Sequence, residues 1–324
     1  MGRLKYGLVR VAVSVVLYHP DPADLQVTLG RLSGWAHGPV LVHLNEADDV
    51  PDWLSALLPD ARITASADNR GFSGGHNALV AAAFGDGADV VLVHNPDLLL
   101  GDEAVATLSA ASVEHPRALL GPALQLADGP ELRPTGRVDT LGIVWTRSSR
   151  HLDGGQGRPW VPPTGPPREV AGISGAALWV SREVHEALVE ACGELFDEDF
   201  IAYREDAELA FRAALLGIPS LLVPEAHGLH GRSLRGTTRG DSVHVDRLGV
   251  RNRFLLAAKY GRHRPGGVLG PVARDAVVLA GVLARERSSW PGVTDAWRLR
   301  GRMRAKGRVV LRAARLTSRQ AAHL

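Results

Sequence analysis

Four short segments of the sequence carry side chains that could bind phosphate, hold a metal ion or move a proton. They are a glycine-rich run at 68–77, an Asn-Pro-Asp at 95–97, an acidic run at 196–209, and the pair His227 and His230. Each segment also has an ordinary structural explanation. Their chemistry therefore depends on the elements that position them.

The glycine-rich run Asp68–Asn77 follows an expected strand at 62–65 and opens an expected helix at 76–84. Free backbone N–H groups and the helix dipole favour a phosphate at such a point. The run lacks the Lys-Ser/Thr of a P-loop and the glycine spacing of a dinucleotide fingerprint. Taken alone, a tight turn with a helix cap is the simpler explanation.

Asn95-Pro96-Asp97 ends an expected buried strand at 90–94. Open α/β sheets place their ligands at this edge, and a carboxylate there can hold a divalent cation. Mg²⁺ favours one or two carboxylates together with substrate phosphates. All three residue types also favour turns, so the motif alone is explained as well by a strand-end turn.

The acidic run leads into an expected helix at 205–216 that Gly217 stops. Acids in a first helical turn commonly only complement the helix dipole. A carboxylate held at a half-buried helix start could also serve as a general base. His227 and His230 follow an expected strand at 221–223 and matter as ligands only beside a metal.

Strand and helix alternate in the first half of the chain. Apolar runs and helical spacing predict strands at 9–17, 40–44, 62–65 and 90–94, and helices from Asp21-Pro22, at 51–58, 76–84 and 102–112. This order predicts an α/β fold with a mostly parallel sheet and helices on both faces.

The middle of the chain is less regular. Residues 153–167 hold four glycines and five prolines, which predicts a loop that covers or borders the active site. Regular structure is expected again at 170–173, at 176–180, and in a helix at 182–191 capped by Ser181. After residue 243 the chain is expected to be helical and increasingly basic.

Length and composition limit the possible classes of protein. A chain of 324 residues suits one large α/β domain or two small ones. With 45% hydrophobic and 22% charged residues, the chain is not wholly disordered. The single cysteine, Cys192, excludes a disulfide framework and a cysteine-based zinc cluster, and fits a reducing compartment.

The net charge of +2 hides an asymmetry, because eleven Lys/Arg and two acids fall after residue 284. The apolar stretch 268–284, interrupted by Arg274 and Asp275, suits an interfacial helix better than a bilayer span. The N-terminal apolar run is expected to be a core strand and not a signal peptide, since no small-residue cleavage site follows. We expect a catalytic domain at 1–260 and a basic helical extension at 261–324 that contacts a membrane surface or a second subunit, but no nucleic acid.

Taken in order, the motifs resemble those of family 2 glycosyltransferases, most closely the rhamnosyltransferase branch of bacterial cell-surface glycan synthesis. The matching segments are Tyr18–Asp21, Asn69–Asn77, Asn95–Asp97, Ile173–Ala176, Phe196–Asp206 and Arg251-Asn252. The resemblance implies a GT-A fold, a nucleotide-sugar donor, a divalent metal (Mg²⁺ or Mn²⁺) and inversion at the anomeric carbon.

The resemblance also implies roles for single residues. Asp206 would be the general base for the acceptor hydroxyl, and Glu205 would shape the acceptor site or orient Asp206. Asp97 would hold the metal that bridges the donor phosphates, with His230, or less favourably His227, completing its shell. Residues implied to shape the donor pocket are Tyr18, Asn45, Asn69, Gly71, Gly74, Asn77, Asn95, Ser174 and Gly175.

The sequence departs from the family pattern at the end of the second strand. Leu44 stands where an aspartate usually contacts the nucleobase, and Ala47 where a serine is usual. A neighbour such as Asn45 would have to contact the base, or base recognition is altered. Glu208 in place of the usual aspartate is a milder departure.

We therefore expect an inverting, metal-dependent glycosyltransferase that uses a dTDP- or UDP-sugar, dTDP-rhamnose among them. Its acceptor would be a lipid-linked glycan or a small molecule, in the cytoplasm or at the inner face of the plasma membrane. One alternative is a catalytically inactive nucleotide-sugar-binding module, which the retention of Asp97 and Asp206 opposes. The other is a sugar nucleotidyltransferase, whose usual glycine-rich, basic signature is replaced here by Tyr18–Pro22.

Overall fold

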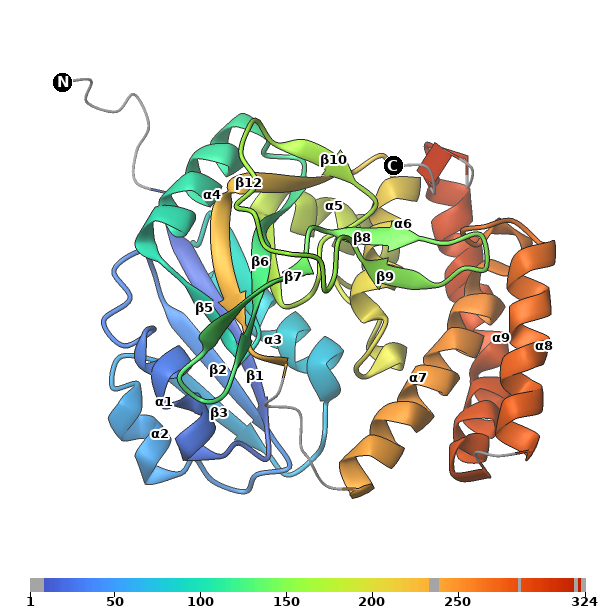
Figure 1. Ribbon diagram of the computed structural model, residues 1–324, viewed down its shortest axis with the longest axis horizontal. Helices are drawn as coiled ribbons and strands as arrows, with labels where there is room; N and C mark the ends of the chain where they lie inside the picture. The colour runs from blue at the N-terminus through green and yellow to red at the C-terminus, as the bar shows by residue number, and fades with distance from the viewer. Residues whose placement is uncertain (1–8, 233–238, 285–286, 318–319, 322–324) are drawn as a thin grey trace.

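The computed structural model describes residues 9–232, 239–284, 287–317 and 320–321. Ten strands of this part form one sheet: β1 (Val11–Tyr18), β2 (Val40–Asn45), β3 (Arg62–Ser66), β4 (Val90–His94), β5 (Leu98–Leu100), β6 (Leu119–Asp128), β7 (Arg133–Thr140), β10 (Arg168–Val170), β11 (Ala177–Ser181) and β12 (Ser220–His230). Their order is β10-β12-β6-β11-β4-β1-β2-β3, with β5 paired to β12 and β7 to β6 (Figure 1). A separate hairpin joins β8 (Ile143–Trp145) and β9 (His151–Asp153).

The valine-rich β1 lies at the centre of the parallel part of the sheet. Each of its residues except Tyr18 is buried, as expected for a strand covered on both faces. It pairs in parallel with β2 and with β4, and β2 pairs in parallel with β3. The carboxyl ends of these strands therefore share one edge, where open α/β sheets bind ligands.

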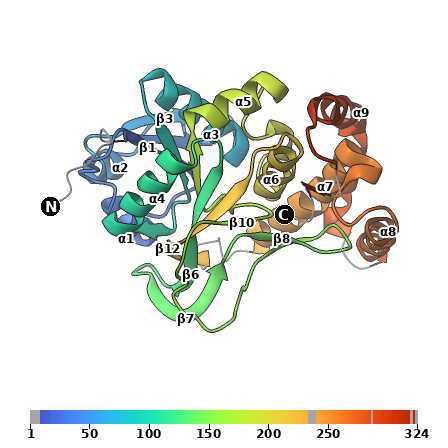
Figure 2. The ribbon, with the colours of Figure 1, turned by 90° about the horizontal axis from the view of Figure 1, so that it is seen from above.

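Two groups of helices cover the sheet, one on each face. The helices α1 (Pro22–Gly30), α2 (Asp52–Leu57) and α4 (Asp102–Glu114) share one apolar core, whereas α3 (Gly71–Gly85), α5 (Arg182–Cys192) and α6 (Glu205–Leu215) contribute to the other. Figure 2 shows the sheet between the two groups. The predicted α/β class, with a mostly parallel central sheet and helices on both faces, is confirmed.

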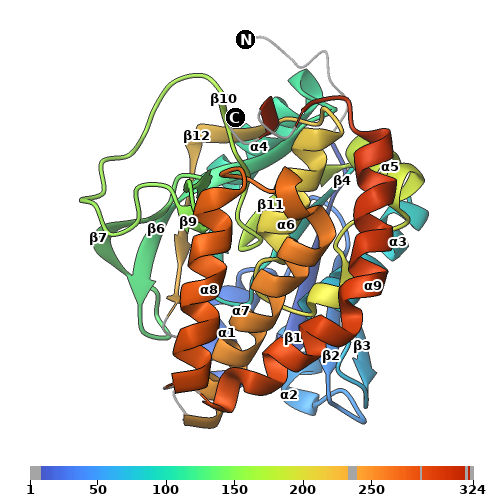
Figure 3. The ribbon, with the colours of Figure 1, turned by 90° about the vertical axis from the view of Figure 1, so that its right-hand side faces the viewer.

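Three C-terminal helices form a further layer beside α6: α7 (Arg239–Tyr260), α8 (Leu269–Ala284) and α9 (Trp290–Ala313) (Figure 3). Apolar residues of α6, α7 and α9 share one core. The backbones of α7 and α9 approach closely, because a Cβ built at Gly307 would lie 1.8 Å from the Lys259 carbonyl oxygen. Within the described ranges, none of the helices is long and apolar enough to cross a membrane.

Basic residues of α9 also pair with the acidic run. Lys306 lies 2.7 Å from Glu194 and 2.8 Å from Asp199, and Arg302 lies 2.8 Å from Asp199. Part of the positive charge of the C-terminal segment therefore neutralises carboxylates of the body. Deleting α9 would expose these carboxylates together with the apolar residues beneath the helix.

The structure differs from the sequence prediction in three places. Helix α3 begins at Gly71, five residues earlier than expected. The strands from β5 to β9 were not predicted, because glycine and proline interrupt the patterns of β6 and β7. Strand β12 continues to His230 because a register shift between Val223 and His227 carries the pairing past Pro224.

Candidate active site

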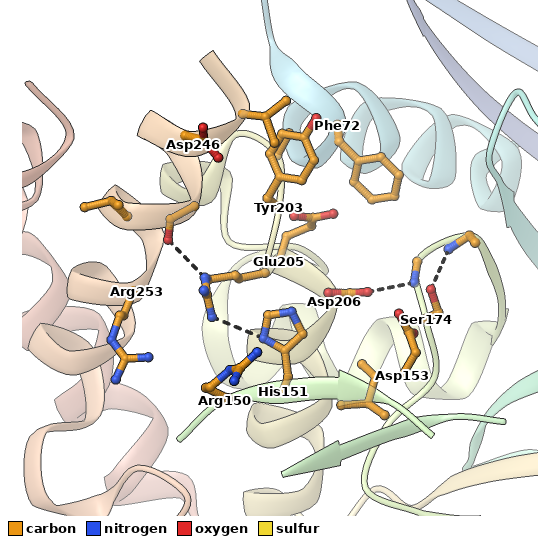
Figure 4. Close-up of a pocket in the computed structure, with 18 of the residues that line it drawn as sticks. Phe72, Arg150, His151, Asp153, Ser174, Tyr203, Glu205, Asp206, Asp246 and Arg253 are labelled. Carbon is orange, nitrogen blue, oxygen red and sulfur yellow. Dashed lines mark hydrogen bonds between the residues drawn. The ribbon is translucent and has the colours of Figure 1, made fainter. Parts of the chain in front are cut away.

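A pocket of about 850 Å³ opens between the carboxyl end of β4, the start of α6, and the helices α7 and α8. Figure 4 shows residues that line it. Six of the predicted site residues are among the lining: Asn95, Ser174, Gly175, Glu205, Asp206 and His230. The structure thus brings together four segments that lie far apart in the sequence.

Asp206 lies at the start of α6 with its carboxylate facing the 174–176 segment. The backbone N–H of Gly175 donates to Asp206 Oδ2 at 3.1 Å (Figure 4). The backbone N–H of Asn95 donates to the Ala176 carbonyl oxygen at 3.0 Å. The Ser-Gly segment therefore connects the end of β4 to the predicted general base.

The turn before α6 is strained. Ile201, Tyr203 and Arg204 have φ values of 63°, 68° and 68°, a region that non-glycine residues rarely adopt. Asn252 Nδ2 lies 2.7 Å from each of the carbonyl oxygens of Phe200, Ala202 and Tyr203. The neighbouring Arg251 also donates to the Asp199 carbonyl at 2.7 Å. The Arg251-Asn252 pair therefore fixes the turn that presents Glu205 and Asp206.

His230 and Asp97 meet because of strand register. The antiparallel pairing of β12 with β5 sets His230 opposite Leu98, beside Asp97. His230 Nε2 lies 3.1 Å from Asp97 Oδ1, and Nδ1 lies 2.8 Å from Asp139 Oδ2. Burial alone would lower the pKa of His230, but the hydrogen bonds to Asp139 and Asp97 and their charges raise it to about 9.

These residues fit a metal only together with a phosphate-bearing ligand. Asp97 offers a carboxylate, but His230 can offer a ring nitrogen only after it loses the proton that the two aspartates stabilise, and Asn95 Nδ2 lies 3.3 Å from the same imidazole. The residues that the structure describes include no group of three or more His, Cys, Asp or Glu side chains placed to hold a metal. A cation such as Mg²⁺ needs few protein ligands when a diphosphate supplies the others.

Three predicted asparagines connect loops and do not line the pocket. Asn45 Oδ1 accepts from the Arg70 N–H at 2.8 Å, and Asn69 Oδ1 accepts from the Gly71 N–H at 2.8 Å. Asn77 donates to the Phe196 carbonyl and accepts from the Phe196 N–H, both at 2.9 Å. They hold the amino end of α3 against β2 and against the acidic run.

Four N–H groups at the start of α3 donate within the protein, which argues against the expected phosphate cradle. Besides the Arg70 and Gly71 amides, the Ser73 N–H donates to the Ile201 carbonyl and the Gly74 N–H to the Arg70 carbonyl. Gly71 has φ +66°, and a Cβ there would lie 2.6 Å from the Ile201 oxygen. A glycine is therefore needed at position 71 for the close packing of α3 against the strained turn.

Other predicted residues lie outside the pocket. Tyr18 is half exposed at the end of β1, where its ring stacks on His19 at 4.1 Å. Leu44 is buried in the core and so cannot reach a nucleobase. His227 contacts the Pro163 carbonyl at 3.1 Å, away from Asp97. Of the Pro/Gly-rich loop, only its first residue, Asp153, borders the pocket.

Several lining residues had no signal in the sequence. Arg232 bonds to Asp139 and to Asp153, extending the chain of charges from His230. Four arginines and one histidine line the side nearer α7 and α8: Arg150, His151, Arg204, Arg253 and Arg274. Arg150 and His151 belong to the β8–β9 hairpin, which the sequence does not predict, and Arg274 stands out in the sequence only as a break in an apolar stretch.

No protein-family model and no curated protein matches the sequence. Among solved structures, the chain is similar to a crystal structure of GalNAc-T7 with UDP, GalNAc and Mn²⁺, with a TM-score of 0.57 and 13% identity. The match covers 84% of this chain and 54% of that one. The chain has the GT-A fold. It spans about half the length of that GT-A neighbour, so the likeness concerns architecture and not the whole protein.

A second structure with likeness to this GT-A chain is S. aureus TarS 1-349 in complex with UDP. It has a TM-score of 0.45 and 14% identity, over 86% of this chain and 73% of that one. This likeness is too weak to support an argument.

Proposed function

We propose that the protein is a glycosyltransferase that moves a sugar from a nucleoside-diphosphate donor to an acceptor hydroxyl with inversion at the anomeric carbon. The observation that carries the proposal is the position of Asp206. It lies in a pocket of about 850 Å³ in a GT-A fold, joined through Gly175 and Ala176 to the strand end that bears Asn95. The neighbour crystallised with UDP, GalNAc and Mn²⁺ supports the same class of donor.

In the proposed reaction, the Asp206 carboxylate takes the proton of the acceptor hydroxyl. The freed oxygen forms a bond to the anomeric carbon as the bond from that carbon to the diphosphate breaks, and the nucleoside diphosphate leaves with the electron pair. The Gly175 N–H orients the carboxylate, and Glu205 shapes the acceptor side of the pocket. Asp97 and His230 would hold a divalent metal, which supplies charge neutralisation for the departing diphosphate.

The finer assignment is to family 2 and to its rhamnosyltransferase branch, with a dTDP- or UDP-sugar as donor. It rests on the ordered motifs of the sequence. Because Leu44 is buried and the Asn45 amide is bonded to the 70–71 backbone, neither residue lies free to read the base. A thermal-shift screen of UDP-, dTDP- and GDP-sugars would identify the donor, since a bound ligand stabilises the fold.

Asp97→Ala is expected to abolish the metal dependence of donor binding. The variant removes the only carboxylate beside His230 Nε2 among the described residues, so Mg²⁺ or Mn²⁺ should no longer increase the thermal shift caused by the nucleotide sugar. In the wild type, EDTA should stop sugar transfer, and added Mn²⁺ should restore it. Full transfer in EDTA would show that the Asn-Pro-Asp motif is only a turn. Asp102→Ala, on the exposed first turn of α4, is the matched control.

We also propose that residues 1–260 are the catalytic unit and that the 261–324 segment contacts an anionic membrane surface bearing the acceptor. Apolar side chains stand exposed along α8, with Leu269 at 87% and Val277 at 60% exposure. On α9, Arg304, Arg308 and Arg312 are exposed. An interfacial helix with nearby arginines gains from both apolar insertion and charge.

Full-length protein is expected to co-sediment with vesicles containing phosphatidylglycerol, and less so at high salt. Leu269→Gln combined with Val272→Gln should reduce the bound fraction severalfold, because both residues lie on the exposed side of α8. Val161→Gln, which changes an exposed valine outside the 261–324 segment, is the control. Absence of vesicle binding by the wild type would contradict membrane contact and favour a small-molecule acceptor.

A further inference from the structure

We propose that the end of the pocket between the β8–β9 hairpin, α7 and α8 is a binding site for a phosphate group that carries an apolar chain. Its use as the acceptor site rests on the proposed function. The binding site itself rests on arginines that the structure brings together and that form no ion pair with a carboxylate of the described residues. The residues that form it are Arg150, Arg204 and Arg274, together with His151, which follows Arg150 in the chain and contacts Arg204.

Arg204 is a buried cation held by neutral groups. Its Nε donates to the Gly249 carbonyl at 3.1 Å, and its Nη1 contacts His151 Nδ1 at 3.3 Å. Burial, and to a lesser extent the charge of Arg204, lowers the pKa of His151 to about 3. The imidazole is therefore neutral, and its Nδ1 can accept a hydrogen bond. Burial, and then the charge of Arg253, lowers the pKa of Arg204 to about 10, which still leaves the guanidinium charged near neutral pH.

Arg150 and Arg274 add two further guanidinium groups to this end. Neither forms an ion pair with a carboxylate of the described residues, and Arg274 Nε is buried with no hydrogen-bond partner. A buried donor without a partner is costly, because it has lost its bonds to water. Oxyanions satisfy such donors, and the planar guanidinium matches phosphate geometry well.

Two carboxylates beside this end are engaged by other arginines, whereas Glu205, Asp206 and Asp246 line the same pocket and offset part of its positive charge. Asp275 accepts from Arg253 at 2.7 Å through Oδ1 and from Arg264 at 2.6 Å through Oδ2. Asp153 pairs with Arg232 on the opposite side of the pocket. Among the described residues, Arg150, Arg204 and Arg274 form no ion pair with any of these carboxylates, so their guanidinium groups remain able to bind a ligand.

This end of the pocket is distinct from the end that bears the donor motifs. Figure 4 places Arg150, His151 and Arg253 on one side of Asp206 and Ser174 on the other. Ser174 belongs to the segment that contacts the end of β4, beside Asp97 and His230. The predicted base thus lies between the two ends, as a base between donor and acceptor must.

An apolar wall continues from Arg274 along the same helix. Val277, Val278 and Val282 line the pocket at helical spacings of three, four and eight residues from Arg274. The same helix carries the exposed Val272 and Leu283 outside the pocket. A ligand with a phosphate at the arginines would therefore place its next atoms against apolar side chains, which selects an alkyl or isoprenoid phosphate over free phosphate.

The test uses octyl phosphate and inorganic phosphate as probes, titrated calorimetrically into the full-length protein with and without saturating UDP or dTDP. We expect octyl phosphate to bind in both conditions and at least tenfold more tightly than inorganic phosphate. Arg274→Gln and Arg150→Gln should each weaken it about tenfold, as loss of a charge-assisted bond predicts. Arg308→Gln, on the exposed surface of α9, should leave it unchanged.

The nucleotide arm separates the two sources of phosphate. If the arginines hold the acceptor, both arginine variants keep wild-type affinity for the nucleoside diphosphate. Displacement of octyl phosphate by the nucleotide, or equal weakening of both ligands, would assign the site to the donor and overturn the proposal. Absence of octyl phosphate binding by the wild type would overturn it as well.

A second variant tests the apolar wall. Val278→Gln should remove most of the preference for octyl over inorganic phosphate, whereas Val309→Gln should not. Equal affinity of the wild type for the two probes would refute the apolar part of the proposal. None of these measurements requires sugar transfer. The test of this site is therefore independent of the test of the proposed glycosyltransferase activity.

Discussion

Asp206→Asn is expected to bind nucleotide sugar with near wild-type affinity while its transfer rate falls by about 10²–10⁴-fold. The amide oxygen of asparagine can still accept one of the two bonds that the Gly175 and Ala207 N–H groups donate to Asp206, so the start of α6 should keep most of its geometry. The amide cannot take the proton of the acceptor hydroxyl. Transfer is measured as release of nucleoside diphosphate in the presence of acceptor, and donor binding by thermal shift or calorimetry.

Asp246→Asn is the matched control, because Asp246 is an exposed carboxylate that lines the same pocket. It should lower transfer by no more than a few fold. If Asp206→Asn kept more than about half of the wild-type rate, the assignment of the base would be wrong. The assay also separates the alternatives: an inactive module binds donor without transfer, and a nucleotidyltransferase releases pyrophosphate from a nucleoside triphosphate.

The sequence was sufficient to predict the parallel half of the fold. Valine-rich runs such as β1 and capped helices such as α5 have local periodicity, so their type and order follow from the chain itself. The place of Asp206 at a helix start was also predictable, because its acidic run precedes an amphipathic helix, whereas its role as base stays a prediction that rests on the family resemblance. Each of these features depends on residues that are neighbours in the sequence.

The antiparallel strands and one side of the pocket depend on pairing between strands that lie far apart in the sequence. Asp139 meets His230 only because β7 and β12 both pair with β6, and no local pattern distinguishes its carboxylate. Arg150 faces Arg204 across 54 positions of sequence through a hairpin with weak strand signals. Long-range register of this kind is set by tertiary packing and not by local propensity.

The glycine-rich run shows how a correct motif can carry an incomplete physical explanation. The expected role was a phosphate cradle of free N–H groups. In the structure four of those groups donate within the protein, and Gly71 permits the approach of Ile201. The run therefore positions the turn before Asp206, an indirect contribution that depends on a contact 130 positions away.

Lys259→Met is expected to destabilise the protein by about 3–5 kcal/mol, the range measured when one partner of a buried ion pair is removed. The Lys259 ammonium lies 2.5 Å from Asp197 and 2.6 Å from Glu208, and both carboxylates are fully buried. Methionine fills a similar volume but leaves two buried acids without this cation. The free energy of unfolding, measured in urea, should show the loss.

The pH dependence of this loss tests its electrostatic origin. Burial alone would raise the pKa of Asp197, but the charges of Lys259 and Lys306 lower it to about 2, from an ordinary value of 3.8. A carboxyl whose pKa is lower in the folded state stabilises the fold above about pH 3.8, and this contribution disappears as the pH falls toward 2. The difference in stability between wild type and Lys259→Met should therefore be constant near neutral pH and narrow between pH 4 and 2.

Lys306→Met is the control, because Lys306 is partly exposed and water can solvate the carboxylates that it leaves. It should lower the free energy of unfolding by less than Lys259→Met does. A Lys259→Met protein within 1 kcal/mol of wild type at pH 7 would show that α7 is held to the acidic run by apolar packing and not by this buried pair.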